Sequence, residues 1–222
     1  MNNFDFYNPT RIAFGEGKIA ALDTLVPAAA KVLILFGGES ARRTGTLGEV
    51  EAALGNRQVQ LFGGIEPNPS FETLMEAVTV VQRDGIDYLL AVGGGSVIDG
   101  TKFVAAASVF DGDAWDILLK GGTNIHRALP FGSVLTLPAT GSEMNKGAVV
   151  TRKSLQAKLP FHSEHVFPQF SVLDPTKSFT LPPRQVANGV VEAFVHIVEQ
   201  YLTYPASAPV QDRFAEGLLQ TL

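Results

Sequence analysis

Tyr88-Leu89-Leu90-Ala91-Val92-Gly93-Gly94-Gly95-Ser96-Val97-Ile98-Asp99 is the stretch that decides the fold of this chain. Its five apolar residues without polar alternation predict a strand buried on both faces, and the three glycines allow a tight turn and a close approach to an anion. Ser96 is predicted to cap a helix from Val97 to Ser108. The positive end of that helix would face the glycine turn and suit a diphosphate. A tight strand-to-helix turn without a ligand has the same local pattern.

The segments before this stretch repeat the alternation of strand and helix. Lys31–Phe36 is predicted as a buried strand ended by a glycine pair, and Thr46–Leu54 as the following helix. Val59–Phe62 predicts a short strand and Phe71–Arg83 an amphipathic helix. Such units predict a parallel sheet with right-handed crossovers and a ligand site beyond the carboxyl ends of its strands.

The second half of the chain changes from strands to helices. Phe131–Leu137 predicts a strand that leads into a polar loop, and Ala148–Thr151 and Phe170–Leu173 predict shorter strands. After Pro183 the apolar residues recur every three or four positions, and Val210–Leu222 predicts a further helix, inside which the chain stops without a capping signal. We expect an α/β fold, in which residues 1–183 form a Rossmann-like, parallel-sheet dinucleotide-binding domain and residues 184–222 begin an all-helical domain.

Composition narrows the function. The chain has 222 residues, 45% of them apolar, and a formal charge of -5 with scattered Lys and Arg, which argues against a nucleic-acid partner. It has no Cys, so any metal would be held by His, Asp or Glu. No basic leader precedes an apolar segment and no apolar run is long enough to cross a membrane, so we expect a cytoplasmic protein.

One helical pair has metal-binding chemistry. Glu192 and His196 are four residues apart and would project from one helix face. A carboxylate and an imidazole suit Fe(II), Zn or Mn, but two ligands hold such an ion poorly, and the same spacing produces an ordinary surface ion pair. His162 and His165 lie in a segment without a helical frame, and we assign no metal to them.

Four motifs in order resemble the iron-containing alcohol dehydrogenases, most closely the NADPH-dependent aldehyde reductases and butanol dehydrogenases. They are Pro9–Gly17, Gly93–Lys102, Leu137–Glu143 and Leu173–Pro175. The resemblance implies an N-terminal dinucleotide-binding domain, an all-helical C-terminal domain, a catalytic metal in the cleft between them and a homodimer. It also implies that the chain is truncated in the helical domain.

The resemblance assigns roles to individual residues. It makes Gly93, Gly94, Gly95 and Ser96 the pyrophosphate loop and Asp99 a contact near the nicotinamide. The remaining implied cofactor contacts are Gly38, Ser40, Asn68, Thr136, Leu137, Asn145 and Lys158, and the implied metal ligands are Glu192 and His196. Glu192 stands where relatives carry an Asp, and the other two ligands of the family are histidines further along than this chain extends.

The segment after the first strand bears on the choice of cofactor. By the resemblance, Gly38 and Ser40 would leave room for the 2′-phosphate of NADP and bind it. Glu39 would instead suit the free ribose hydroxyl of NAD, although Arg42 and Arg43 offset its charge. We expect NADP and leave NAD open.

Two functions follow from these expectations. The first is a dehydrogenase that uses Fe(II) or Zn to transfer hydride between NAD(P)H and short-chain aldehydes or alcohols. The second is a dinucleotide-binding fragment that lacks half of the metal site and binds without turnover, and we expect this chain as given to behave in that way. A zinc-dependent glycerol dehydrogenase shares the fold, but its resemblance to Gly37–Arg43 and Pro138–Glu143 is weaker.

Overall fold

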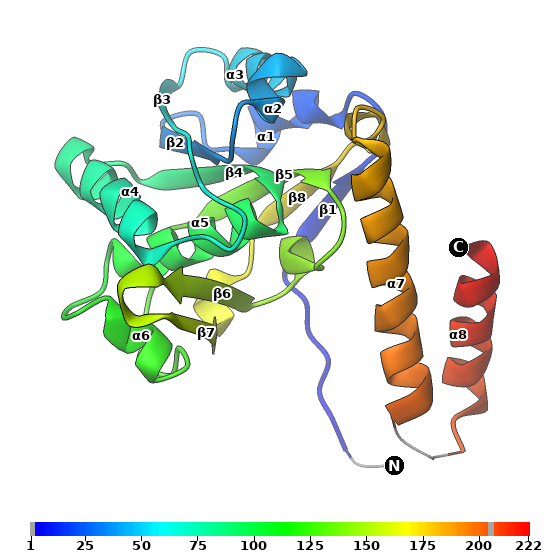
Figure 1. Ribbon diagram of the computed structural model, residues 1–222. Helices are drawn as coiled ribbons and strands as arrows, with labels where there is room; N and C mark the ends of the chain where they lie inside the picture. Colours follow the sequence, from blue (N-terminus) through cyan, green and yellow to red (C-terminus); the bar gives the residue numbers. More distant parts are fainter. Residues whose placement is uncertain (1–2, 204–206) are drawn as a thin grey trace.

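The computed structural model describes residues 3–203 and 207–222 and has a six-stranded parallel sheet at its centre (Figure 1). The sheet order is β1-β8-β5-β4-β2-β3, and every neighbouring pair is parallel. The strands are β1 Arg11–Phe14, β2 Lys31–Phe36, β3 Gln58–Phe62, β4 Tyr88–Gly94, β5 Phe131–Leu137, β6 Gly147–Arg152, β7 Ala157–His162 and β8 Phe170–Leu173. The predicted Rossmann-like sheet is confirmed.

Helices cover both faces of the sheet. They are α1 Leu22–Leu25, α2 Ser40–Arg43, α3 Thr46–Leu54, α4 Phe71–Asp84, α5 Gly95–Ala107, α6 Trp115–Leu119, α7 Pro183–Thr203 and α8 Pro209–Thr221. Short 3-10 turns are η1 Lys18–Ala21, η2 Ser142–Met144, η3 Lys153–Leu155, η4 Glu164–Val166 and η5 Pro175–Ser178. One core cluster joins the sheet to α4, α5 and α6, and a second joins its other face to α1 and α3 (Figure 1).

The chain reverses direction across the sheet next to β2. From β2 it continues to β3 at one edge and then returns to β4 on the other side of β2. A crevice forms at the carboxyl ends of two strands whose connections leave in opposite directions. The glycines after β2 and β4 therefore meet at one place.

The predicted cap of α5 is wrong. The helix begins at Gly95 and its N-cap is Gly94, which makes no side-chain capping bond, so Ser96 lies inside the first turn. β4 extends through Gly94, because Gly93 and Gly94 pair with β5. The turn is therefore tighter than the sequence pattern suggested.

A two-stranded hairpin packs beside the sheet. β6 confirms the predicted strand at Ala148–Thr151, and β7 pairs with it antiparallel. We did not predict β7, although its apolar residues alternate at Ala157, Leu159 and Phe161. Pro160 obscures this pattern, and it is tolerated because β7 is an edge strand.

α7 and α8 form an antiparallel pair at the side of the α/β part (Figure 1). α7 has no buried residue, and Ala215 is the buried residue of α8. Among the apolar side chains that both helices expose are Val191, Phe194, Leu202 and Phe214. Within residues 3–203 and 207–222, no helix combines the length and apolar content that crossing a membrane would require.

Candidate cofactor groove and metal pair

A groove of about 520 Å³ lies at the carboxyl ends of β2, β4 and β5. Its floor is the glycine turn, and its other walls come from α2 and from the segment that leads into α7. Eight of the twelve predicted cofactor contacts line it: Gly38, Ser40, Gly93, Gly94, Gly95, Ser96, Thr136 and Leu137. The structure therefore brings together most of the residues that were chosen from separate motifs.

The glycine turn at residues 93–95 lines the groove and also packs closely against neighbouring side chains. A Cβ on Gly93 would lie 2.6 Å from Val97 Cγ2, and a Cβ on Gly95 would lie 2.2 Å from Thr140 Oγ1. These positions accept no side chain without rearrangement. No side chain caps the start of α5, so the first amides of this 13-residue helix lack an intrahelical hydrogen-bond partner. They lie at the groove and can bind an anion.

Positive charge lies at one side of the groove. Arg43 and Lys177 line it, and the Lys177 ammonium is also paired with the Glu49 carboxylate at 2.6 Å. Glu39 does not line the groove, and its carboxylate lies 3.6 Å from Arg42 Nε. The Glu39 carboxylate, which in the sequence favoured NAD over NADP, therefore lies near Arg42 and outside the groove.

Asn68 and Lys158 stand beside the groove and are joined to it through Ser96. Lys158 Nζ donates to Asn68 Oδ1 at 2.7 Å, and the backbone N–H of Asn68 donates to Ser96 Oγ at 3.3 Å. Asn68 adopts a left-handed backbone conformation, with φ 57°. The β6–β7 hairpin thereby carries Lys158 to the end of the glycine turn.

Asp99 and Asn145 lie behind the glycine turn in a network that does not line the groove. Asp99 Oδ1 accepts from Ser142 Oγ at 2.6 Å, and Asp99 Oδ2 accepts from the Val149 amide at 3.0 Å. Burial raises the pKa of Asp99 above its ordinary value, while these hydrogen bonds act in the opposite direction. Its predicted contact with the nicotinamide therefore stays a prediction.

Lys102 is the centre of this network, and the sequence analysis gave it no role. Its side chain is fully buried, and Nζ donates to Ser142 Oγ at 2.9 Å, Asn145 Oδ1 at 2.9 Å and the Gly147 carbonyl at 2.8 Å. Burial lowers the pKa of Lys102 to about 7, and the nearby Asp99 and Glu143 carboxylates oppose that shift. The available signal was a single lysine directly before the apolar run Phe103–Ala107 of α5, because a lysine buried with such residues needs buried partners.

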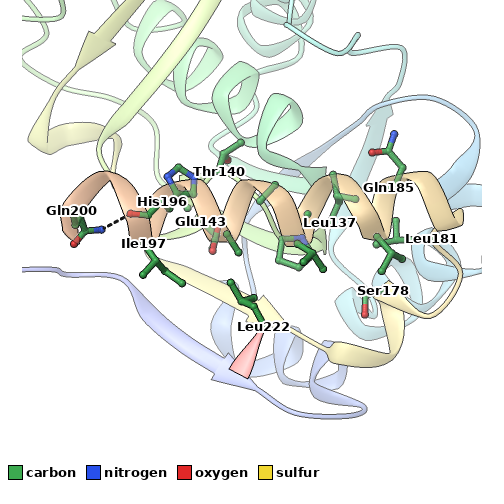
Figure 2. A pocket seen from close by; sticks show the side chains of 17 residues that line it. Leu137, Thr140, Glu143, Ser178, Leu181, Gln185, His196, Ile197, Gln200 and Leu222 are labelled. Atoms are coloured by element: carbon green, nitrogen blue, oxygen red, sulfur yellow. Dashed lines mark hydrogen bonds between the residues drawn. The ribbon is translucent and has the colours of Figure 1, made fainter. Parts of the chain in front are cut away.

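A second cavity, of about 720 Å³, lies between α7 and the loop after β5, and Figure 2 shows it from close by. It shares Leu137, Leu181 and Gln185 with the cofactor groove, so the two spaces adjoin. His196 projects from α7 into it, and Thr140 and Glu143 line the opposite wall (Figure 2). One oxygen of Glu143 is buried and has no hydrogen-bond partner in the described chain.

The predicted metal ligands lie side by side on α7. His196 Nε2 is 3.8 Å from Glu192 Oε1, and both side chains are about half exposed. No group of three or more His, Cys, Asp or Glu side chains in the described parts of the chain is placed to hold a metal ion. The pair fits a divalent first-row ion in kind, but it supplies only two of the three or four protein ligands that such an ion takes.

The chain is similar to a known family and to named proteins. The family model for iron-containing alcohol dehydrogenase matches residues 9–175. The chain is 59% identical to the NADPH-dependent aldehyde reductase YqhD of Escherichia coli and 44% identical to the probable NADH-dependent butanol dehydrogenase 1 of Bacillus subtilis. Both matches cover the whole of this chain and 58% of the relative, so the chain spans less than two thirds of their length.

Solved structures share the same fold. The crystal structure of Escherichia coli YqhD superposes with a TM-score of 0.94 at 58% identity, covering 97% of this chain and 56% of that chain. The NADH-dependent butanol dehydrogenase A of Thermotoga maritima gives a TM-score of 0.93 at 38% identity, covering all of this chain and 56% of that one. The architecture of residues 3–203 and 207–222 is therefore that of a part of these longer proteins.

Proposed function

This chain belongs to the iron-containing alcohol dehydrogenase family, and on that premise we propose that it carries the cofactor-binding half of an enzyme that reduces short-chain aldehydes with NADPH. The observation that carries the proposal is the groove at the ends of β2, β4 and β5, which gathers eight predicted cofactor contacts around one helix N-terminus. Relatives named as aldehyde reductase and butanol dehydrogenase support the substrate class.

The cofactor lies across the glycine turn in this proposal. The amides at the start of α5 bind the pyrophosphate, because they have no intrahelical acceptor. Thr136 and Leu137 flank the adenine or its ribose at the end of β5. The nicotinamide half of the cofactor would then contact Asn68, Asp99, Asn145 and Lys158.

NADPH is favoured over NADH by the charges in the groove. Arg43 and Ser40 offer a guanidinium and a hydroxyl to the 2′-phosphate, while Glu39 does not line the groove and lies near Arg42. The NADPH-dependent relative at 59% identity supports this preference, although NADH-dependent relatives also match the whole chain.

Glu192 and His196 would hold a divalent ion, Fe(II) or Zn, with further ligands from the length that the relatives have beyond this match. Such an ion polarises the carbonyl of an aldehyde when bound. The second cavity brings His196 beside the cofactor groove and lines the reaction space with apolar side chains. We accordingly propose residues 1–183 as the dinucleotide-binding domain and 184–222 as the start of a metal-binding helical domain.

A homodimer through the N-terminal region is part of the proposal. β1 is an edge strand of the sheet, and Phe14 on it is 65% exposed. The preceding arm exposes Phe4, Phe6 and Tyr7. Sedimentation of the purified chain tests this arrangement, and a monomer at micromolar concentration would contradict it.

Fluorescence titration with NADPH and NADH tests the cofactor site. We expect saturable binding of both cofactors, with a lower dissociation constant for NADPH than for NADH. Arg43→Ala should reduce the ratio of the NADH to the NADPH dissociation constant by about tenfold, because one hydrogen bond from a charged group is lost. Arg83→Ala removes an arginine paired with Asp84 on the far end of α4 and should leave the ratio unchanged. Absence of NADPH binding to the intact chain refutes the proposal.

The metal half is tested with a chimera. The chain joined to the remaining length of Escherichia coli YqhD should oxidise NADPH in the presence of butanal and Fe(II) or Zn(II). His196→Ala in the chimera should abolish turnover and keep the NADPH affinity, because His196 does not line the cofactor groove. Turnover by the chain alone at the rate of the chimera would show that our assignment of half a metal site is wrong.

A further inference from the structure

Lys102 makes three hydrogen bonds from a position with no exposed surface, and all three acceptors lie within residues 142–147, between the end of β5 and the first residue of β6. Three acceptors match the three donors of an ammonium group. The lysine is therefore a buried clamp between α5 and residues 142–147. The cofactor groove itself does not include it.

The clamp determines which way the Asn145 amide faces. Asn145 Oδ1 accepts from Lys102 Nζ at 2.9 Å and from the Gly147 amide at 3.0 Å. Lys102 Nζ and the Gly147 backbone N–H can only donate hydrogen bonds. The atom that faces them must therefore be the side-chain oxygen of Asn145 and not its side-chain nitrogen. The nitrogen must then face the opposite direction.

Asn145 Nδ2 is the donor that remains. It makes no hydrogen bond to the described residues, and it lies 4.0 Å from the Cβ position of Gly141. Gly141 lines the cavity along α7, next to Thr140 and Glu143. Nδ2 of Asn145 therefore lies beside a residue that lines this cavity, although Asn145 itself does not line it.

Asp99 is linked to the same lysine only through Ser142, and the Val149 amide holds its second oxygen independently of Lys102. Ser142 Oγ accepts from Lys102 and donates to Asp99 Oδ1, so its proton points to the carboxylate. The backbone of η2 is held separately, because Ser171 Oγ donates to the Glu143 carbonyl at 2.7 Å. Loss of Lys102 would therefore disturb the side chains of Asn145 and Ser142 more than the path of the loop.

We propose that Lys102 is a positioning residue of the cofactor site, which turns the Asn145 amide so that its N–H groups donate to an acceptor oxygen of the bound dinucleotide. This inference rests on the proposed function, since it requires that the chain binds NADPH. Lys102 touches neither cofactor nor substrate, and it acts through Asn145.

A double-mutant cycle on NADPH affinity tests the proposal. Lys102→Met and Asn145→Ala should each weaken binding by about tenfold, the loss of one hydrogen bond. Because Lys102 acts through Asn145, the double variant should bind no more than about twofold more weakly than Asn145→Ala alone. Independent losses of about a hundredfold in the double variant overturn the proposal.

Lys146→Met is the matched control. Lys146 adjoins Asn145 on the same loop, but its ammonium pairs with Glu164 at the surface. Its NADPH affinity should equal that of the unsubstituted chain. If the unsubstituted chain does not bind NADPH, the proposed function fails; if it binds and Lys102→Met binds equally well, only the role of Lys102 fails.

Asn145→Asp keeps the proposal testable if Lys102→Met does not fold. The carboxylate still accepts from Lys102 and Gly147, so the fold should persist, but it has no N–H to donate. We expect at least tenfold weaker NADPH binding. In nuclear magnetic resonance spectra, the side-chain amide pair that this variant removes should shift when NADPH is added to the unsubstituted chain. Unchanged affinity of Asn145→Asp, or an unshifted amide pair, overturns the proposal.

Discussion

Leu90 in the middle of β4 has no exposed surface, whereas Leu202 near the end of α7 is 71% exposed. The same contrast holds for the two candidate sites. The glycine turn is built on a sheet covered by helices on both faces, while Glu192 and His196 stand on a helix without a buried residue. A site gains precision from the buried scaffold behind it. In this chain the cofactor groove has such a scaffold and the metal pair does not.

The largest expected difference concerns the two leucines. Leu90→Ala should lower the free energy of unfolding by about 2–5 kcal/mol, because it leaves a cavity in the core. Leu202→Ala should change it by less than about 0.5 kcal/mol, as an exposed position does. Urea denaturation measures both. Similar losses at the two positions would mean that α7 is as well packed as the sheet, contrary to the contrast drawn above.

A methyl group in the glycine turn should have the next largest effect. Gly95→Ala brings a Cβ within 2.2 Å of Thr140 Oγ1, and the overpacking should cost about 1–3 kcal/mol of stability. NADPH affinity should fall at least tenfold, because the start of α5 has to move. Gly48→Ala in α3 is the control, since no atom lies within 4 Å of its added Cβ. If Gly95→Ala binds NADPH normally, the turn is not the pyrophosphate seat.

Low pH should weaken the ion pair between Lys153, in the β6–β7 hairpin, and Glu66, in the segment before α4. Burial alone would raise the pKa of Glu66, but hydrogen bonds from its own backbone, Lys153, Ser70 and Thr73 lower it to about 2. The stabilisation is therefore complete above pH 4.5 and is lost as the pH falls toward 2. Glu66→Gln should cost about 1 kcal/mol or less at pH 7, because the pair is partly exposed.

Urea unfolding of the two proteins between pH 7 and pH 3 measures this link. The difference in stability should shrink steadily below pH 4.5, since Glu66 of the unfolded chain then binds a proton while the folded carboxylate, with its pKa of about 2, stays charged. Lys158 reaches Asn68 from the same hairpin, so a weaker hairpin should also reduce NADPH affinity. A difference that stays constant with pH would exclude the Glu66 carboxylate as its source.

The smallest effect is expected between the two helices of the α7–α8 pair. Tyr201→Phe removes an exposed hydrogen bond of 3.2 Å to Glu216. Water replaces that partner on both sides, so the urea midpoint and the NADPH affinity should not change measurably. A clear loss of stability would show that the pair is more firmly packed than the exposure of its side chains indicates.

Much of the architecture was predictable because it depends on local pattern. The buried run Tyr88–Val92 and the helices at Thr46–Leu54 and Phe71–Arg83 have periods that specify their type. The cap at Ser96 was wrong, because pairing with β5 extends β4 through Gly94 and α5 begins directly after it at Gly95, two residues before the predicted start at Val97. β7 was missed because a proline interrupts an otherwise clear alternation.

The candidate site likewise contains features that the sequence predicted and features that it did not. Strand order brings Gly38 and Gly95 to one groove, and a parallel sheet with this topology has to place the ends of β2 and β4 together. The linear order of residues carries that information in its strand and turn pattern. It likewise places Glu192 and His196 one turn apart on α7, because a helix repeats every 3.6 residues.

The roles of Lys102, Asn145 and Glu39 depend on contacts between residues distant in the chain. Lys102 meets its acceptors 40 to 45 positions away, and nothing near it in the sequence indicates the direction of the Asn145 amide. Glu39 is adjacent to two groove residues, yet its carboxylate turns to Arg42. Backbone periodicity specifies where an element runs, whereas the direction of a polar side chain is settled by the partners that folding brings to it.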